Sequence, residues 1–348
     1  MQLSIFHRVV ALSLLLASSW ARADLVVLQY HHIDDSTPPS TSTTPSLFDA
    51  QLALIDELGL EVVPLDTATR DALAGRSADR QQVAITFDDA HASVLTAAAP
   101  RLARKNFPYT IFVNTQAIGQ PGYLNWQQLD ELNRQPGVTI ANHSADHGHL
   151  ARRLNEPQEA WLQRVQTSMD TAQETLRKRL GVESTLFAYP YGEFDRDLEA
   201  LVAARGWLGY GQHSGAIGAS SHPTRLPRFP MANAYGQLNA LTDKLRSKAL
   251  PVDAGDLPDG VIDAQQTGGN PPRLRLTLPE TLAAGRLSCF ASRQGRIAVT
   301  AIGKHTVSVV APESFNSRRF RYNCTYPAGA GRYYWFSQPW LDLSQPED

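Results

Sequence analysis

The sequence lacks the features that mark nucleic-acid-binding and membrane-surface proteins. Its 348 residues carry a formal charge of −2 at pH 7, and no block of lysine and arginine interrupts this balance. Internal repeats and low-complexity tracts are missing too. We therefore expect neither nucleic acid nor an anionic membrane as a partner. The apolar fraction of 43% is ordinary for a globular protein, which excludes disorder as the default state.

Long apolar runs are also missing, and the one notable run is short and lies near the N-terminus. It extends from Val9 to Ala17, and Ala21-Arg22-Ala23 follows with the small-x-small pattern of a cleavage site. This pattern predicts a signal peptide over residues 1–23. Because the run is far shorter than the roughly 20 residues that span a bilayer, we expect no stable membrane anchor. The protein should then be exported, either to the periplasm or to the medium.

Cysteine is scarce, and both cysteines, Cys289 and Cys324, lie near the C-terminal end of the sequence. In an oxidising compartment two such residues are expected to form a disulfide. Two buried thiols are the alternative.

Short apolar runs alternate with amphipathic stretches through residues 24–250. Each run is brief and rich in β-branched or aromatic residues, as in strands that are buried on both faces of a parallel sheet. The runs begin at Leu25, Val83, Thr110, Val138 and Thr185. The stretches between them have helical periodicity, so the sequence predicts an α/β domain whose parallel sheet is open or closed.

The pattern changes near residue 250. Residues 251–272 are rich in Pro, Gly and Asp, which is typical of a linker. Residues 273–348 contain short stretches that alternate between apolar and polar residues, as in Leu274-Arg275-Leu276-Thr277-Leu278. They predict a small all-β domain that resembles a sandwich.

Unusual polar residues follow four of the predicted strands at their carboxyl ends. These residues are Tyr30-His31-His32, Asp88-Asp89, the segment from His143 to His147, and Tyr189-Pro190-Tyr191-Gly192. In parallel α/β folds the carboxyl ends of the strands share one face, which carries the active site. The four segments should therefore converge.

Two histidines and a carboxylate among these residues could bind a metal. His143 and His147 are four residues apart, so on a helical turn their imidazoles would project from one face. Asp88 or Asp89 could complete the set and the other aspartate could serve as a base, which is a known hydrolytic arrangement. Taken alone, the histidines could be a solvated pair and the aspartates a helix cap. Imidazole and carboxylate ligands suit a divalent transition metal, and we expect Zn²⁺, with Co²⁺, Ni²⁺ or Fe²⁺ as alternatives.

The motifs resemble those of a known family. Thr86-Phe87-Asp88-Asp89 and His143-Ser144-Ala145-Asp146-His147 are similar to the TFDD and H-[ST]-x-x-H motifs of the polysaccharide deacetylases, carbohydrate esterase family four. The segment from Phe107 to Val113 and Leu124-Asn125-Trp126 resemble further family segments in the same order. The resemblance covers about residues 25–231.

The resemblance implies a fold and a set of roles. The fold would be a distorted (β/α)7 barrel, followed here by the small β domain. Asp88 would be the general base, and Asp89, His143 and His147 would bind the metal. The backbone N–H at the position of Tyr191 would help to hold the oxyanion that forms at the acetyl carbon.

Two departures from the family pattern suggest a particular branch. Ala188-Tyr189-Pro190-Tyr191 lacks the arginine of the usual R-x-P-Y motif, and no L-x-[IV]-x-H motif ends the domain. The chain resembles the permuted branch that includes exported poly-N-acetylglucosamine deacetylases. In that branch an early Y-H strand supplies the acid and a later L-P-R supplies the arginine, which implies His31 as acid and Arg228 as the partner of Asp88. Alternatively, His31 is a core histidine or exchanges its role with His32, and Arg228 forms a surface ion pair.

We expect an exported enzyme that removes N-acetyl groups from an N-acetylhexosamine polymer and releases acetate. One alternative is an O-acetyl esterase that acts on xylan or another acetylated glycan. Another is a non-catalytic glycan-binding protein that binds through aromatic residues of the β domain. Trp126 could line a sugar cleft or belong to the core. His149, Asp146, His213 and His222 are expected on the rim or in loops.

Overall fold

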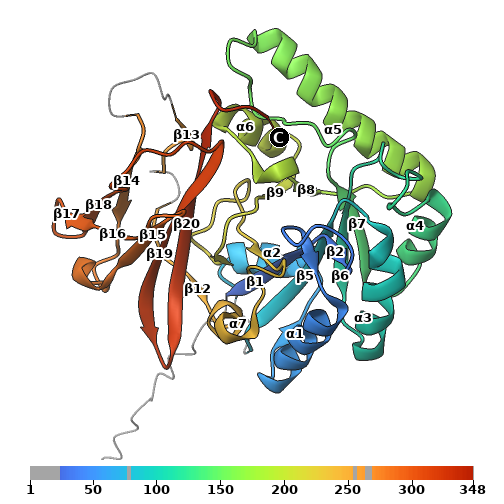
Figure 1. Ribbon diagram of the computed structural model, residues 1–348, viewed down its shortest axis with the longest axis horizontal. Helices are drawn as coiled ribbons and strands as arrows, with labels where there is room; N and C mark the ends of the chain where they lie inside the picture. The colour runs from blue at the N-terminus through green and yellow to red at the C-terminus, as the bar shows by residue number, and fades with distance from the viewer. Residues whose placement is uncertain (1–23, 77–79, 254–256, 263–268, 348) are drawn as a thin grey trace, which may run out of the picture.

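The computed structural model describes residues 24–76, 80–253, 257–262 and 269–347. The predicted signal peptide, residues 1–23, lies outside these ranges. A curled α/β part and a strand-rich C-terminal part lie side by side (Figure 1). Among the described residues, no helix has both the length and the apolar character needed to cross a membrane.

The α/β part is built on a curled, incompletely closed sheet, as expected for a distorted barrel (Figure 1). Six strands along its path run parallel, and β10 is added antiparallel at one edge. In sheet order the strands are β10 (Ala216–Ile217), β1 (Leu25–Tyr30), β5 (Gln82–Asp88), β6 (Tyr109–Val113), β7 (Val138–Asn142), β8 (Leu186–Ala188) and β9 (Leu208–Tyr210). Two short strands pair off this path, β11 (Phe229–Pro230) with β1 and β4 (Glu61–Val62) with β5. A further parallel pair is formed by β2 (His32–Ile33) and β3 (Ser42–Thr43).

Helices connect and cover the strands, as the alternating pattern predicts. They are α1 (Pro45–Glu57), α2 (Leu65–Leu73), α3 (Ala99–Lys105), α4 (Trp126–Asn133), α5 (Gln158–Leu180), α6 (Arg196–Ala204) and α7 (Leu238–Leu245). A π-helical turn, Val94–Ala98, leads directly into α3. The long α5 is followed by Gly181 as its C-cap, whose φ of +68° is accessible to glycine at little cost.

The two faces of the central strands are buried in different cores. Along β1, Val26 and Leu28 pack with residues of α1, α3, α4 and α7, whereas Leu25 and Val27 pack with α2 inside the curled sheet. Because side chains alternate along a strand, Gln29 shares the inner face. On β5 the same alternation places Asp88 on the inner face, two residues after Thr86. Gln29, Thr86 and Asp88 thus bring polar groups into the interior near the carboxyl ends of β1 and β5.

The C-terminal part is a sandwich of two sheets that enclose one core, as expected from the sequence. The larger sheet has the order β12 (Lys248–Ala249), β20 (Arg332–Asp342), β19 (Arg319–Gly329), β15 (Ser288–Ala291) and β16 (Gly295–Ile297), with β13 (Val261–Ile262) also paired to β20. The smaller sheet has the order β14 (Arg273–Thr277), β18 (Thr306–Val310) and β17 (Val299–Ala301). A disulfide joins Cys289 of β15 to Cys324 of β19, which confirms the predicted pairing. The strand β13 lies inside the segment that the sequence marks as a linker.

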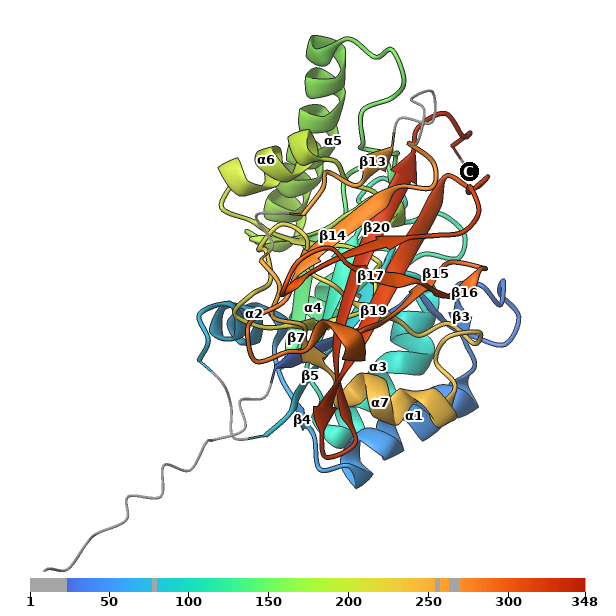
Figure 2. The ribbon, with the colours of Figure 1, turned by 90° about the vertical axis from the view of Figure 1, so that its left-hand side faces the viewer.

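The larger sheet of the sandwich lies across the barrel. Figure 2 shows β19 and β20 running side by side in front of the barrel strands. Trp335 of β20 packs edge-on against Phe229 of β11, with ring centroids 5.2 Å apart. The main chain of Leu250 donates a hydrogen bond to the carbonyl oxygen of Trp335. The sandwich therefore forms part of the surroundings of the strand ends.

Candidate active site

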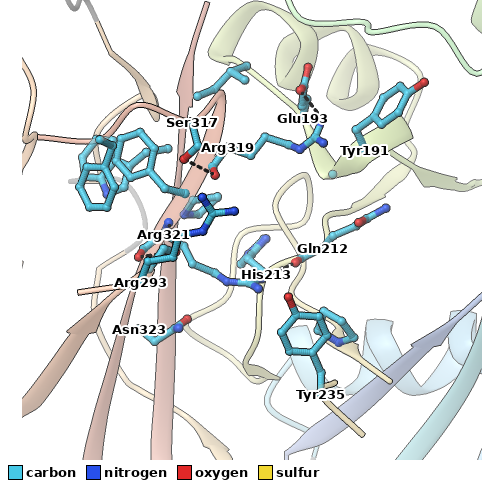
Figure 3. A pocket seen from close by; sticks show the side chains of 18 of the residues that line it. Tyr191, Glu193, Gln212, His213, Tyr235, Arg293, Ser317, Arg319, Arg321 and Asn323 are labelled. Carbon is cyan, nitrogen blue, oxygen red and sulfur yellow. Dashed lines mark hydrogen bonds and ion pairs between the residues drawn. The ribbon is translucent and has the colours of Figure 1, made fainter. Parts of the chain in front are cut away.

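A cleft of about 1230 Å³ lies between the barrel and the sandwich. Its barrel wall includes His31, Asp89, His147 and Tyr191, all of which the sequence singles out. Its other wall comes from β19 and from the loops of the sandwich (Figure 3). The four strand-end segments therefore converge, and they do so opposite a wall that the sequence does not predict.

Asp89, His143 and His147 bring one ligand atom each to a common point. The three atoms lie within 4.8 Å of one another. Oδ1 of Asp89 is 3.5 Å from Nε2 of His143 and 3.2 Å from Nε2 of His147. Two ligands bound tetrahedrally at 2.0–2.1 Å are about 3.3 Å apart, so these separations suit an ion such as Zn²⁺ between them.

Unsatisfied polar atoms give a second indication that this set fits a metal. Oδ1 of Asp89 and Nε2 of His143 are buried, and neither has a hydrogen-bond partner among the described residues. Buried polar atoms are nearly always paired, so two such atoms that face each other fit a metal ion bound between them. Burial would raise the pKa of Asp89, but His91, His143 and His147 hold it far below its usual value.

His143 is held in the tautomer that a metal ligand needs. Its Nδ1 lies 2.7 Å from the carbonyl oxygen of Ala188, to which it donates, so that the lone pair of Nε2 faces Asp89. Burial lowers the pKa of His143 to about 4, which keeps the imidazole neutral at neutral pH. The expected helical turn is wrong: residues 143–147 form a loop after β7, and positive φ angles at Ser144 (65°) and His147 (54°) bring the two imidazoles together.

Asp88 is fully buried and bound from two sides. Both of its oxygens accept hydrogen bonds from Arg228, at 2.7 and 2.8 Å, and Oδ2 also accepts one from Gln29 at 2.7 Å. Burial alone would raise the pKa of Asp88, but the charges of Arg228 and His143 outweigh it and lower the pKa to about 2. Asp88 is therefore a fixed carboxylate at any ordinary pH.

Arg228 is as deeply buried as its partner, so the surface ion pair considered above is excluded. Its Nε donates to the carbonyl oxygen of Gly211 at 2.9 Å, and Nη1 also donates to Oγ1 of Thr86 at 3.2 Å. Its guanidinium lies 5.2 Å from the ring of Phe112. These contacts hold the guanidinium in the orientation in which it forms the ion pair with Asp88.

The two adjacent histidines have different surroundings. His31 follows β1 directly and lines the cleft. His32 begins β2 and stacks on His91, with ring centroids 3.5 Å apart. Burial lowers the pKa of His31, while the charges of Asp89 and Asp88 oppose that effect. Burial also lowers the pKa of His32, to about 4. Of the two, His31 is the one placed to meet a molecule in the cleft.

Tyr191 lies on a tight turn at the edge of the cleft. Its φ is 59°, and its ring stacks on His149 at 3.9 Å between centroids. The next residue, Gly192, has φ +69°, and a Cβ there would lie 2.6 Å from the Cβ of Gln212. Only glycine fits this position, so the turn that carries Tyr191 has a fixed shape.

Three features of the site are missing from the sequence prediction. Gln29 contacts Asp88. The sequence feature that could have indicated this role is that Gln29 is the only polar residue before Tyr30 in the apolar strand β1. His91 places Nε2 3.4 Å from Oδ2 of Asp89, the oxygen that faces away from the other histidines. Glu193 binds Arg318 and Arg319 of the sandwich, and no local pattern indicates that contact.

The residues expected on the rim have several positions. His213 is buried and lines the cleft, and burial lowers its pKa to about 3. His149 is buried against Glu193, and Asp146 accepts a hydrogen bond from Ser168. His222 contacts Thr224 in a loop. Trp126 begins α4, packs partly against the outer core and lies under Arg179, so it is a core-edge residue.

Comparisons with known proteins agree with the resemblance seen in the sequence. Residues 75–208 match the family model of the polysaccharide deacetylases. The chain is 21% identical over 259 residues to the poly-beta-1,6-N-acetyl-D-glucosamine N-deacetylase of Escherichia coli K12. That match covers 64% of this chain and 38% of the relative, so the chain spans well under half the length of this curated protein.

Solved structures share the fold of the barrel. A deacetylase from Streptococcus pyogenes, PplD, solved with acetate, superposes with a TM-score of 0.56 at 22% identity over 64% of this chain and 99% of that one. IcaB from Ammonifex degensii gives 0.52 at 23% identity over 59% and 91%. The deacetylase domain of BpsB from Bordetella bronchiseptica gives 0.52 at 22% identity over 60% and 96%.

Proposed function

We propose that this chain, whose residues 75–208 match the family model of the polysaccharide deacetylases, removes N-acetyl groups from an N-acetylhexosamine polymer and releases acetate. One observation carries the proposal. Asp88, in a buried ion pair with Arg228, is the chain neighbour of Asp89, whose ligand atom converges with those of His143 and His147. Asp89 and His147 line a large cleft. This is the arrangement of a hydrolytic site with a base beside a metal position.

The proposed roles follow from the positions of the residues. A divalent transition metal, for which we expect Zn²⁺, would be held by Asp89, His143 and His147 and would polarise both water and the acetyl carbonyl. Asp88 takes a proton from the water as its oxygen attacks the acetyl carbon. With a pKa of about 2, Asp88 is a weak base, so the pKa of the attacking water must be lowered at this site for the proton transfer to occur.

Two further groups complete the reaction. The backbone N–H of Tyr191 donates to the oxygen of the tetrahedral intermediate. His31 gives a proton to the nitrogen as the C–N bond breaks, which leaves a free amine on the sugar and acetate. Because burial lowers its pKa, the protonated imidazole of His31 is a stronger acid than an exposed histidine.

We also propose export, as the expected signal peptide implies. The disulfide between Cys289 and Cys324 supports it, because such bonds persist mainly in oxidising compartments. The polymer is the ligand proposed for the cleft.

An assay of acetate release tests the proposed function. The purified protein should release acetate from chitin oligosaccharides or poly-N-acetylglucosamine and lose this activity on treatment with a chelator. Added Zn²⁺ or Co²⁺ should restore it. Acetylxylan and peptidoglycan complete the panel, because release from acetylxylan alone would indicate an O-acetyl esterase. No release from any of the four, or full activity in metal-free protein, would reject the proposal.

A further inference from the structure

The sandwich wall of the cleft is positively charged at its centre. Along β19, Phe320, Tyr322 and Cys324 point into the sandwich core. The alternate residues Arg319, Arg321 and Asn323 therefore face the barrel and line the cleft (Figure 3). One strand thus presents two guanidinium groups opposite the site.

Arg319 already interacts with two other residues of the protein. Its Nη1 donates to Oε1 of Glu193 at 2.9 Å, and its guanidinium lies 5.2 Å from the ring of Tyr191. This arginine therefore supports the turn beside the site, and its charge is already balanced in part.

Arg321 differs, because no carboxylate among the described residues lies within ion-pair distance of it. It reaches across the cleft, and Nη1 donates to the carbonyl oxygen of Gln212 at 2.9 Å. Burial lowers its pKa, but an arginine remains charged at neutral pH. A half-buried guanidinium without a counter-ion costs free energy that an anion bound in the cleft would offset.

The other charges around the cleft do not satisfy Arg321. Arg293, exposed at the turn between β15 and β16, adds a further positive charge to the same wall and also makes no ion pair with a described residue. Glu193 is occupied by Arg318, Arg319 and His149, and Glu313 is exposed at the rim, with its main chain bound to Gln294. Asp89 belongs to the metal set.

We propose that the cleft takes an anionic glycan, in which a carboxylate on another sugar unit of the polymer binds Arg321. The inference rests on the proposed function and specifies its substrate class: an N-acetylhexosamine polymer that also contains uronic acid units. The guanidinium suits a carboxylate because the two groups form parallel hydrogen bonds. The cleft volume of about 1230 Å³ leaves space for more than one sugar unit. Tyr235, half exposed on the barrel side, offers a ring for a sugar to pack against (Figure 3).

Two oligosaccharides of equal length provide the test. Chitin oligosaccharides are neutral, whereas hyaluronan oligosaccharides contain N-acetylglucosamine alternating with glucuronic acid. With acetate release normalised per N-acetyl group, the wild-type protein should have a kcat/KM about tenfold or more higher on hyaluronan, as expected for one charge-assisted contact. Equal values, or a preference for chitin, would overturn the proposal.

Arg321→Gln should remove this preference and leave the rest of the site intact. We expect kcat/KM on hyaluronan to fall about 10- to 100-fold, mainly through KM, with less than about a threefold change on chitin. Arg275→Gln is the matched control, because Arg275 is exposed on β14 of the smaller sheet. Equal losses on both substrates would mean that Arg321 only supports the fold, and would also overturn the proposal. If Arg321→Gln does not fold, Arg321→Lys replaces it, since lysine keeps the charge without the planar fork.

Calorimetric binding separates this inference from the proposed reaction. Hyaluronan oligosaccharides should bind the wild-type and Arg275→Gln proteins alike and the Arg321→Gln protein about tenfold more weakly. Such binding without acetate release from any glycan would reject the deacetylase function and retain the anion site. Unchanged binding by Arg321→Gln would reject the anion site alone.

Discussion

Asp88 and Asp89 are neighbours in the chain but have different partners. Asp88 is the last residue of β5 and points into the barrel toward Arg228 and Gln29. At Asp89 the backbone turns to a φ of 71°, which directs the next carboxylate toward His143 and His147. The change of backbone conformation between the two residues therefore separates the proposed base from the proposed ligand.

Replacing each aspartate by asparagine should separate the two roles. Asp88→Asn should lower kcat by about 10²–10⁴-fold while metal remains bound, because it removes only the base. Asp89→Asn should lose both metal and activity, because an amide is a poorer ligand than a carboxylate. Elemental analysis and acetate release on the same preparations measure both effects. Metal loss in Asp88→Asn with retention in Asp89→Asn would mean that the roles are exchanged.

His31→Ala should lower kcat on the amide polymer by about 10²–10⁴-fold with metal content unchanged, because the leaving amine then lacks its proton donor. The kcat of the same variant on an activated aryl acetate, whose leaving group needs no proton, should fall far less. His32→Ala is the matched control, since His32 stacks on His91 rather than lining the cleft. Near-native turnover by His31→Ala together with a large loss in His32→Ala would contradict the assignment.

At the scale of the element, β19 serves two purposes with its two faces. Tyr322 and Cys324 fill the sandwich core, and Arg319, Arg321 and Asn323 line the cleft. The disulfide to Cys289 of β15 fixes this strand within its sheet. Loss of the disulfide should therefore loosen the wall of the cleft as well as the sandwich.

The double variant Cys289→Ser and Cys324→Ser should be less stable by about 4 kcal/mol, the chain-entropy effect of closing a loop of this length. Thermal unfolding with and without reductant measures it. The midpoint of the wild-type protein should fall in reductant toward that of the variant, whereas the variant should not respond. Equal midpoints for the two oxidised proteins would contradict the prediction.

Local patterns in the sequence predict the strands and their polar ends well. The apolar run from Leu25 and the run ending at Asp88 are both strands of the expected type. The positions of His143 and His147 depend instead on left-handed residues, which a four-residue spacing does not reveal. Gln29 binds Asp88, which lies 59 residues later in the sequence. The alternation along one strand predicts which face of the sheet Gln29 occupies, but it does not predict the residue that Gln29 contacts.

At the scale of the whole molecule, Glu193 joins the two parts of the chain. It is almost fully buried, and Arg318 binds it through Nε at 2.8 Å and Nη2 at 3.0 Å. Burial would raise its pKa, but the hydrogen bonds from Arg318 and His149 outweigh that effect and hold it below the usual value. No local pattern in the sequence indicates this long-range contact, which is why the position of the sandwich could not be predicted.

The contribution of Glu193 to stability should depend on pH. Because its folded pKa is lowered, the contribution is complete above the pKa of an unfolded glutamate, about 4.3, and is lost as the pH falls through the folded value. Glu193→Gln should lower the free energy of unfolding by about 1–3 kcal/mol at pH 7, and the difference from wild type should shrink toward pH 3. Calorimetry at both pH values tests it, with Glu57→Gln, at an exposed position at the end of α1, as control. A difference that does not change with pH would contradict the assignment.

The position of β19 also sets the order in which the protein can become active. The strand that closes the cleft follows every barrel strand in the chain, so it is synthesised after them and leaves a ribosome or a translocation channel after them. A nascent chain that ends before Arg318 carries every proposed metal ligand but has neither the partner of Glu193 nor the sandwich wall. The complete site therefore forms only after β19 has followed the barrel, which would delay hydrolysis until the sandwich wall has folded against the metal ligands.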